Sequence, residues 1–119
     1  MDRKILQQRT KQFYVDVIKL CEQFPRNAAG FETAKQVIRS AGSVGANYRA
    51  TKRAKSEKDF IYKIEIVLEE VDESHYWLEV VKEAGIKTGE EVDRLIAEAN
   101  ELTAIFAATD KTFKTNRSK

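Results

Sequence analysis

The stretch QVIRSAGSVGANYR at residues 36–49 decides the fold, because its small residues continue a helical pattern. Starting two residues before this stretch and continuing through it, apolar and small residues recur at spacings of four, three, four and three: Ala34, Ile38, Ala41, Gly45 and Tyr48. This spacing predicts one helix over about residues 31–53, with Gly42 and Gly45 inside it. A glycine inside a helix costs about 1 kcal/mol relative to alanine. We therefore expect close packing against a neighbouring helix to offset the two glycines.

The string GSVG at residues 42–45 matches two ligand-binding patterns only superficially. The GxxG motif of KH domains clamps nucleic acid from a loop beside a sheet, and this chain shows no strand pattern. No Gly-Lys-Ser/Thr follows at the spacing of a phosphate-binding loop. The glycines are therefore predicted to pack rather than to bind.

Helices are also predicted on both sides of this stretch. The first spans about residues 3–23 and ends before Pro25; its apolar face is Leu6, Phe13, Val17, Leu20 and Phe24. The next begins at Ser56, where Asp59 completes a capping box, and stops at Gly85. Its predicted core face is Phe60, Ile64, Leu68, Val71, His75 and Leu78.

A last helix is predicted to begin at Thr88, with Glu91 three residues on. Its apolar face is Val92, Leu95, Ala99, Leu102 and Phe106. Four amphipathic helices with short connections predict an all-α, antiparallel up-and-down four-helix bundle. We expect the bundle to occupy residues 1–112 and a flexible basic tail to occupy residues 113–119.

Length and composition agree with a single helical domain of 119 residues, 42% hydrophobic and 34% charged, with 5 Gly and 1 Pro. The lone Cys21 excludes an internal disulfide and a multi-cysteine metal site. No apolar run approaches membrane-spanning length, and the first residues lack the apolar core of a secretion signal. A cytoplasmic protein is expected.

Charge is segregated along the chain although the net charge is only +2. Residues 49–58 carry one Glu and five basic residues, Arg49, Lys52, Arg53, Lys55 and Lys58. Residues 65–79 carry six acids and no Lys or Arg, and the last ten residues carry a net +3. The basic segment is either a solvated connection between helices or a patch that contacts phosphates of nucleic acid.

The helix that begins at Ser56 has large apolar residues opposite its predicted core face: Tyr62, Ile66, Trp77 and Val80. They are either scattered surface residues or a subunit interface, where Trp and Tyr are enriched. We favour an interface. The acids on this helix could also face the basic segment of a neighbouring subunit, in a head-to-tail contact that closes into a ring when the rotation permits.

No enzyme signature emerges from the sequence. His75 is predicted to be a partly buried core histidine, and Cys21 a small core residue rather than a nucleophile. Asp72 precedes His75 by three residues, but carboxylate-bridged metal bundles need such a motif on two helices, and it occurs here once. No metal, cofactor or catalytic residue is expected.

Three segments together carry a family resemblance: FP at 24–25, QVIRSAGSVGANYR at 36–49, and SEKDFIYKIEIVLEEVDESHYWLEVV at 56–81. They resemble the four helix bundle proteins known as 23S rRNA intervening-sequence proteins, or S23-type proteins. In many relatives Glu-Ala follows the Asn-Tyr-Arg, whereas this chain has Ala50-Thr51.

The resemblance implies a small bacterial homo-oligomer arranged as a pentameric ring. A related bundle, the accessory variability protein of diversity-generating retroelements, works with a reverse transcriptase and binds nucleic acid through a basic surface. We therefore expect a non-enzymatic scaffold or adaptor that binds RNA or DNA, or a nucleic-acid enzyme such as a reverse transcriptase. The alternative is a protein–protein interaction module that binds no nucleic acid.

Overall fold

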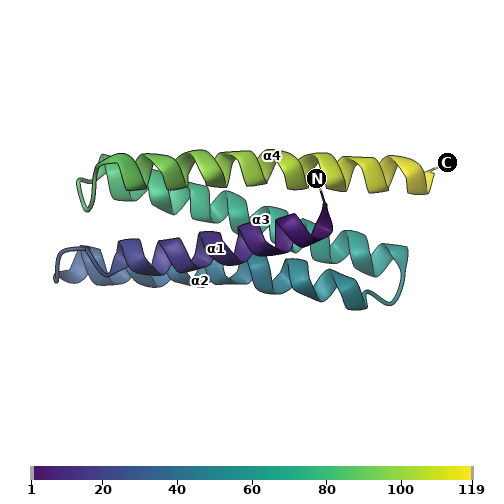
Figure 1. The fold of residues 1–119 in the computed structure, drawn as a ribbon, viewed down its shortest axis with the longest axis horizontal. Helices are drawn as coiled ribbons and strands as arrows, with labels where there is room; N and C mark the ends of the chain where they lie inside the picture. Colours follow the sequence, from purple (N-terminus) through teal and green to yellow (C-terminus); the bar gives the residue numbers. More distant parts are fainter. Residues whose placement is uncertain (1, 119) are drawn as a thin grey trace.

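A computed structural model describes residues 2–118, and it is an antiparallel bundle of four long helices (Figure 1). The elements in chain order are α1 (Arg3–Cys21), α2 (Ala28–Ala50), the 3₁₀ turn η1 (Thr51–Arg53), α3 (Glu57–Glu83) and α4 (Glu90–Ser118). Each helix packs against the next one in the chain, and α4 returns to α1, so that the backbones of the diagonal pairs stay apart. The predicted all-α, up-and-down bundle is confirmed.

The ends of α3 lie where the sequence predicts them. The Ser56 Oγ accepts a hydrogen bond from the backbone N–H of Asp59 at 3.0 Å, which satisfies one of the donors left free at a helix start. At the other end, Gly85 has a φ of +71°, and the Ile86 N–H donates to the Val81 carbonyl at 3.0 Å. Such a left-handed glycine ends a helix by redirecting the chain while the last carbonyls stay bonded.

The predicted capping residue of α4, Thr88, is wrong by one position. Gly89 has a φ of +122°, a conformation outside the helical region, so the helix begins only at Glu90. The N–H of Asp93 then donates to the Gly89 carbonyl at 3.1 Å, which makes the first helical bond.

Beyond residue 112, α4 continues through Ser118. The Phe113 ring lies 4.6 Å from the Phe60 ring of α3, so this part of the helix still contacts the bundle. The predicted flexibility of residues 113–119 stays a prediction, and Lys119 lies outside the described residues.

The predicted apolar faces of α1 and α4 are buried at every position. On α2 Ala41 and Tyr48 are buried as predicted. At the other predicted positions, Ala34, Ile38 and Gly45, the residue is partly exposed and the buried one lies one position earlier, at Thr33, Val37 and Val44. On α3 Ile64, Val71 and Leu78 are buried as predicted, whereas Phe60, Leu68 and His75 are only partly buried. The partial burial expected of His75 is confirmed, but the core positions are those of the adjacent residues Ile61, Val67 and Ser74.

Ser74 is accommodated there because a second buried hydroxyl faces it. The Oγ atoms of Ser74 and Ser40 lie 2.8 Å apart and share a hydrogen bond between α3 and α2. A buried polar group without a partner would cost free energy, so the pair explains how two serines lie in an apolar core.

Gly42 and Gly45 face α1, as the expectation of close packing requires. A Cβ added at Gly45 would lie 3.4 Å from the backbone of Thr10, and one added at Gly42 would lie 3.0 Å from Cζ of Tyr14. The two helices therefore approach closely along this line. Among the described residues, no helix has the length and apolar character that a membrane span requires.

Candidate nucleic-acid interface

The five basic residues predicted to contact phosphate form one exposed corner, which we call the basic corner: Arg49, Lys52, Arg53, Lys55 and Lys58. The corner begins in the last turn of α2, continues through η1, and ends in the first turn of α3. It lies at the end of the bundle where α1 begins and α4 ends (Figure 1).

The backbone of the basic corner is held in place by Thr51, which is buried. Its Oγ1 donates to the Tyr48 carbonyl and accepts a hydrogen bond from Nη2 of Arg3, both at 2.6 Å. The Arg3 guanidinium also lies 5.4 Å from the centre of the Tyr48 ring, within the range of a cation–π contact. Arg3, in the first turn of α1, therefore holds η1 in place, and η1 carries part of the basic corner.

The charges of the basic corner are largely unpaired: among the described side chains, none of the five makes an ion pair or a hydrogen bond, although the charge of Lys55 acts on Asp59. The nearby carboxylate of Asp59 is occupied by Nζ of Lys63 at 2.7 Å and by the backbone N–H of Lys55 at 2.9 Å. These hydrogen bonds, the one from Lys63 first, lower the pKa of Asp59. Elsewhere, Arg39 and Arg94 pair with acids of neighbouring helices.

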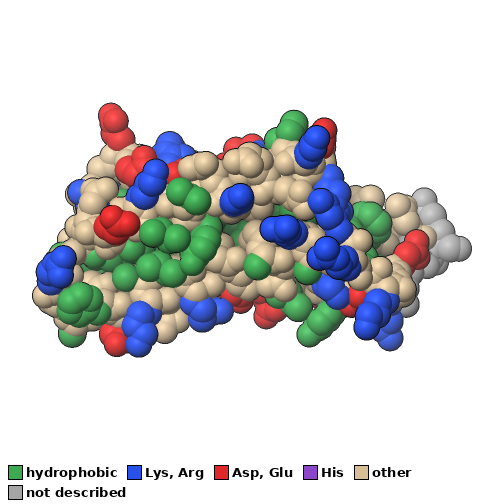
Figure 2. Space-filling view, turned by 60° about the horizontal axis from the view of Figure 1, so that its bottom comes forward, with side chains coloured by type: hydrophobic (Ala, Val, Ile, Leu, Met, Phe, Trp, Pro, Cys, Tyr) green, Lys and Arg blue, Asp and Glu red, His purple; other side chains and the backbone are tan. Residues whose placement is uncertain are grey.

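The corner borders a groove between α1 and α2 of about 510 Å³, which we call the α1–α2 groove. Lys4 and Lys11 line it from α1, and Arg49 and Lys52 line it from α2. Figure 2 shows Lys and Arg side chains gathered over the right half of this face, with hydrophobic side chains in a hollow over the left half.

The sequence reasoning missed Lys4 and Lys11. Their spacing of seven places both on one side of α1, which was the available signal. The sequence alone does not show that this side of α1 lies beside the end of α2.

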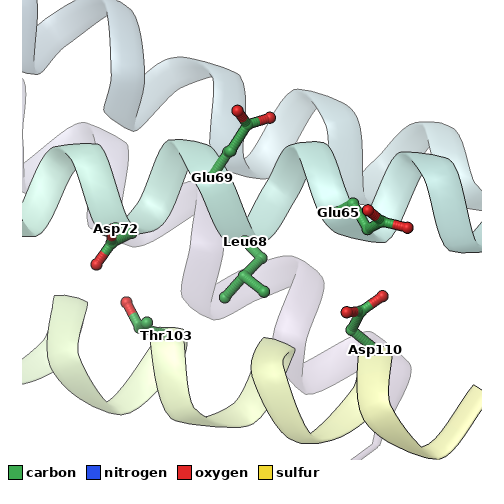
Figure 3. A pocket seen from close by; sticks show the side chains of 6 residues that line it. All are labelled: Glu65, Leu68, Glu69, Asp72, Thr103 and Asp110. Carbon is green, nitrogen blue, oxygen red and sulfur yellow. The ribbon is translucent and has the colours of Figure 1, made fainter. Parts of the chain in front are cut away.

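The opposite face of the bundle carries an acidic groove of about 480 Å³ between α3 and α4. Its lining residues are Glu65, Leu68, Glu69, Asp72, Thr103 and Asp110 (Figure 3). The carboxylates of Glu65 and Asp110 both approach Nζ of Lys114, at 3.6 and 3.2 Å. Among the described residues, no three His, Cys, Asp or Glu side chains are positioned to hold a metal ion.

The four residues of the predicted subunit interface lie on the outer side of α3. Tyr62 is 63% exposed, whereas Ile66, Trp77 and Val80 are partly buried. The indole N–H of Trp77 donates to Oε2 of Glu73 at 3.1 Å, so its polar edge has a partner within the subunit. Tyr76, which is 56% exposed beside Trp77, was missed because it falls outside the predicted stripe.

Cys21 and His75, the two residues considered as possible catalytic groups, make few polar contacts. Burial raises the pKa of the Cys21 thiol to about 12, so little nucleophilic thiolate is present at neutral pH. Nδ1 of the half-buried His75 lies 3.4 Å from Oε1 of Glu79, one turn along the same helix. Neither arrangement resembles a nucleophile with an oriented base.

The fold and these surfaces define the class of the protein: a small antiparallel four-helix bundle with a basic groove on one face and an acidic groove on another. The model of the family described as 23S rRNA-intervening sequence protein matches residues 3–108. The chain therefore belongs to the 23S rRNA-intervening sequence protein family, as its sequence motifs suggested.

A solved structure supports the same assignment. It is the crystal structure of a protein with unknown function from the S23 ribosomal protein family of Bacteroides thetaiotaomicron. The two chains are 29% identical and superpose with a TM-score of 0.84, over 93% of this chain and 99% of the other. A search of curated proteins found no match.

Proposed function

We propose that the protein is a non-enzymatic, homo-oligomeric scaffold or adaptor that binds nucleic acid, or a nucleoprotein partner, through the basic corner. The observation that carries the proposal is that five exposed cations lie on one turn, which Thr51 and Arg3 hold in place, and make no ion pair with a described acidic side chain. Lys and Arg bind nucleic acid by neutralising phosphates, which gives binding that is largely independent of sequence and sensitive to salt.

Reversing the charge of the basic corner is expected to abolish binding. The variant Lys52→Glu/Arg53→Glu/Lys55→Glu changes exposed side chains only, so the fold should persist. Binding of fluorescently labelled RNA and DNA, measured by anisotropy at low and at physiological salt, tests this expectation. We expect wild-type affinity to fall steeply as salt rises.

The matched control is Lys19→Glu/Arg26→Glu/Lys35→Glu, which reverses three exposed charges near the other end of the bundle. It changes the net charge equally and should retain most of the binding. If the wild-type protein binds neither RNA nor DNA even at low salt, the proposed function is wrong.

Assembly is the second part of the proposal. We infer that the outer side of α3, with Tyr62, Ile66, Trp77 and Val80, forms the subunit interface of a homopentamer. The exposed Tyr62 and Tyr76 support an interface, because exposed aromatic side chains are enriched there. Light scattering should give about five times the subunit mass of 13.6 kDa, and Tyr62→Glu should lower that mass. A wild-type monomer at tens of micromolar would contradict the inference.

The acidic groove between α3 and α4 favours one alternative, a protein–protein interaction module. In that case the basic corner of one subunit would contact the acidic groove of the next and serve assembly only. The triple charge reversal would then break the oligomer in light scattering, and the wild-type protein would bind no nucleic acid. Under the main proposal, the same variant loses nucleic-acid binding and remains an oligomer.

A further inference from the structure

We propose that the α1–α2 groove binds a single-stranded nucleic acid, whose phosphates lie along cations of both helices. This inference rests on the proposed function and extends it. It names the form of the nucleic acid, and it adds a binding wall from α1 that residues 49–58 do not include.

The walls of the groove supply the first argument. Lys4 and Lys11 lie on one wall and Arg49 and Lys52 on the other, and no Asp or Glu lines the groove. Within residues 2–118, none of these four side chains makes an ion pair, so their charge is available to a ligand. Two helical turns separate Lys4 from Lys11, which is about 10 Å along α1. The cations therefore follow a line, as the phosphates of an extended strand do.

The other lining groups supply the second argument, since they suit bases rather than phosphates. The ring of Tyr14 lies against Gly42 and lines the groove, where it offers a surface for stacking. Gln7 and Gln8 line the same groove, and the buried Nε2 of Gln7 has no hydrogen-bond partner among the described residues. An aromatic side chain in a positively charged groove is typical of sites for single strands.

A duplex fits this groove less well. It presents its phosphates outward and keeps its bases stacked inside, so it gains nothing from Tyr14 or the glutamine amides. A second subunit, whose acidic groove would face these cations, is a different occupant of the α1–α2 groove. The experiments below distinguish it from a nucleic acid.

The first experiment removes charge from α1 only. The variant Lys4→Gln/Lys11→Gln leaves the basic corner intact, and Lys19→Gln/Lys35→Gln removes two exposed lysines away from the groove as a control. The probes are fluorescein-labelled oligo(dT) and oligo(U) of about 20 nucleotides, longer than the roughly 4–16 that one small fold covers. A duplex of equal length is the third probe.

We expect Lys4→Gln/Lys11→Gln to raise the Kd for the single strands about tenfold and to lower the salt slope by about 1.4. The control should change neither. Comparing oligo(dT) with oligo(U) shows whether the protein prefers DNA or RNA, and the duplex should bind more weakly than both.

The second experiment tests the α2 side of the groove at Ala46, an exposed residue that lines it. Ala46→Glu and Ala46→Gln introduce side chains of nearly equal size, and only the glutamate carries charge. We expect the glutamate variant to bind the single strands about tenfold more weakly than the glutamine variant. Circular dichroism spectra of both variants should match that of the wild type.

The outcomes separate this inference from the proposed function. If charge reversal at the basic corner removes binding while the Lys4/Lys11 and Ala46 variants bind normally, the groove is not the site and the proposed function stands. If the duplex binds as tightly as the single strands, the proposed form of nucleic acid is wrong. If no probe binds the wild type, both are wrong. Oligomers that dissociate on loss of Lys4 and Lys11 would place a second subunit in the groove and overturn the inference.

Discussion

Replacing Phe106 by alanine is expected to lower the free energy of unfolding by about 4 kcal/mol. The Phe106 side chain of α4 is fully buried, and its ring lies 5.2 Å from the ring of Tyr48 on α2, in the tilted arrangement that aromatic pairs prefer. Truncation removes the transfer free energy of the ring and leaves a cavity that the surrounding helices close only in part.

Urea denaturation followed by circular dichroism measures this loss. Phe31→Ala is the matched control, because the Phe31 side chain on α2 is 56% exposed and its truncation should change stability by less than about 0.5 kcal/mol. Similar losses for the two variants would mean that the described core is wrong. Concentration is kept constant, since assembly contributes to apparent stability.

The sequence predicts Phe106 as a core residue because it continues the stripe of Val92, Leu95, Ala99 and Leu102 at spacings of three and four, although the adjacent Ile105 is also apolar. On α2 the same choice arises between the adjacent Val37 and Ile38, and there the predicted residue is the partly exposed one. Periodicity alone does not decide which of them faces the bundle axis. On α3 the sequence favours His75 over Ser74, and only the presence of Ser40 on the facing helix shows why the serine is buried.

One part of the candidate site could be predicted from the sequence and another could not. The basic corner was predictable because its five residues are close in sequence and the turn exposes all of them. The α1–α2 groove was not, because it depends on which side of α1 lies beside α2. The brace of Arg3 on Thr51 joins residues 48 positions apart, and no local pattern signals it.

Gly30→Ala is the second change with a large expected effect, about 3 kcal/mol of lost stability. Gly30 lies in the first turn of α2, where its N–H donates a hydrogen bond to Oδ1 of the capping residue Asn27 at 2.9 Å. A Cβ at this position would lie 2.1 Å from the carbonyl oxygen of Pro25. The space that the alanine methyl group needs is filled by the backbone of Pro25, so the connection between α1 and α2 would have to move.

Gly45→Ala gives the matched comparison, because the same substitution is made inside the same helix. The added Cβ would meet Thr10 at 3.4 Å, an ordinary contact, and alanine is the better helix former. We therefore expect a gain of about 0.5–1 kcal/mol. Urea denaturation of the two variants should move in opposite directions from the wild type. A loss of stability in both would show that the α1–α2 contact at Gly45 is too tight for a methyl group, and that both glycines are required by close backbone approach.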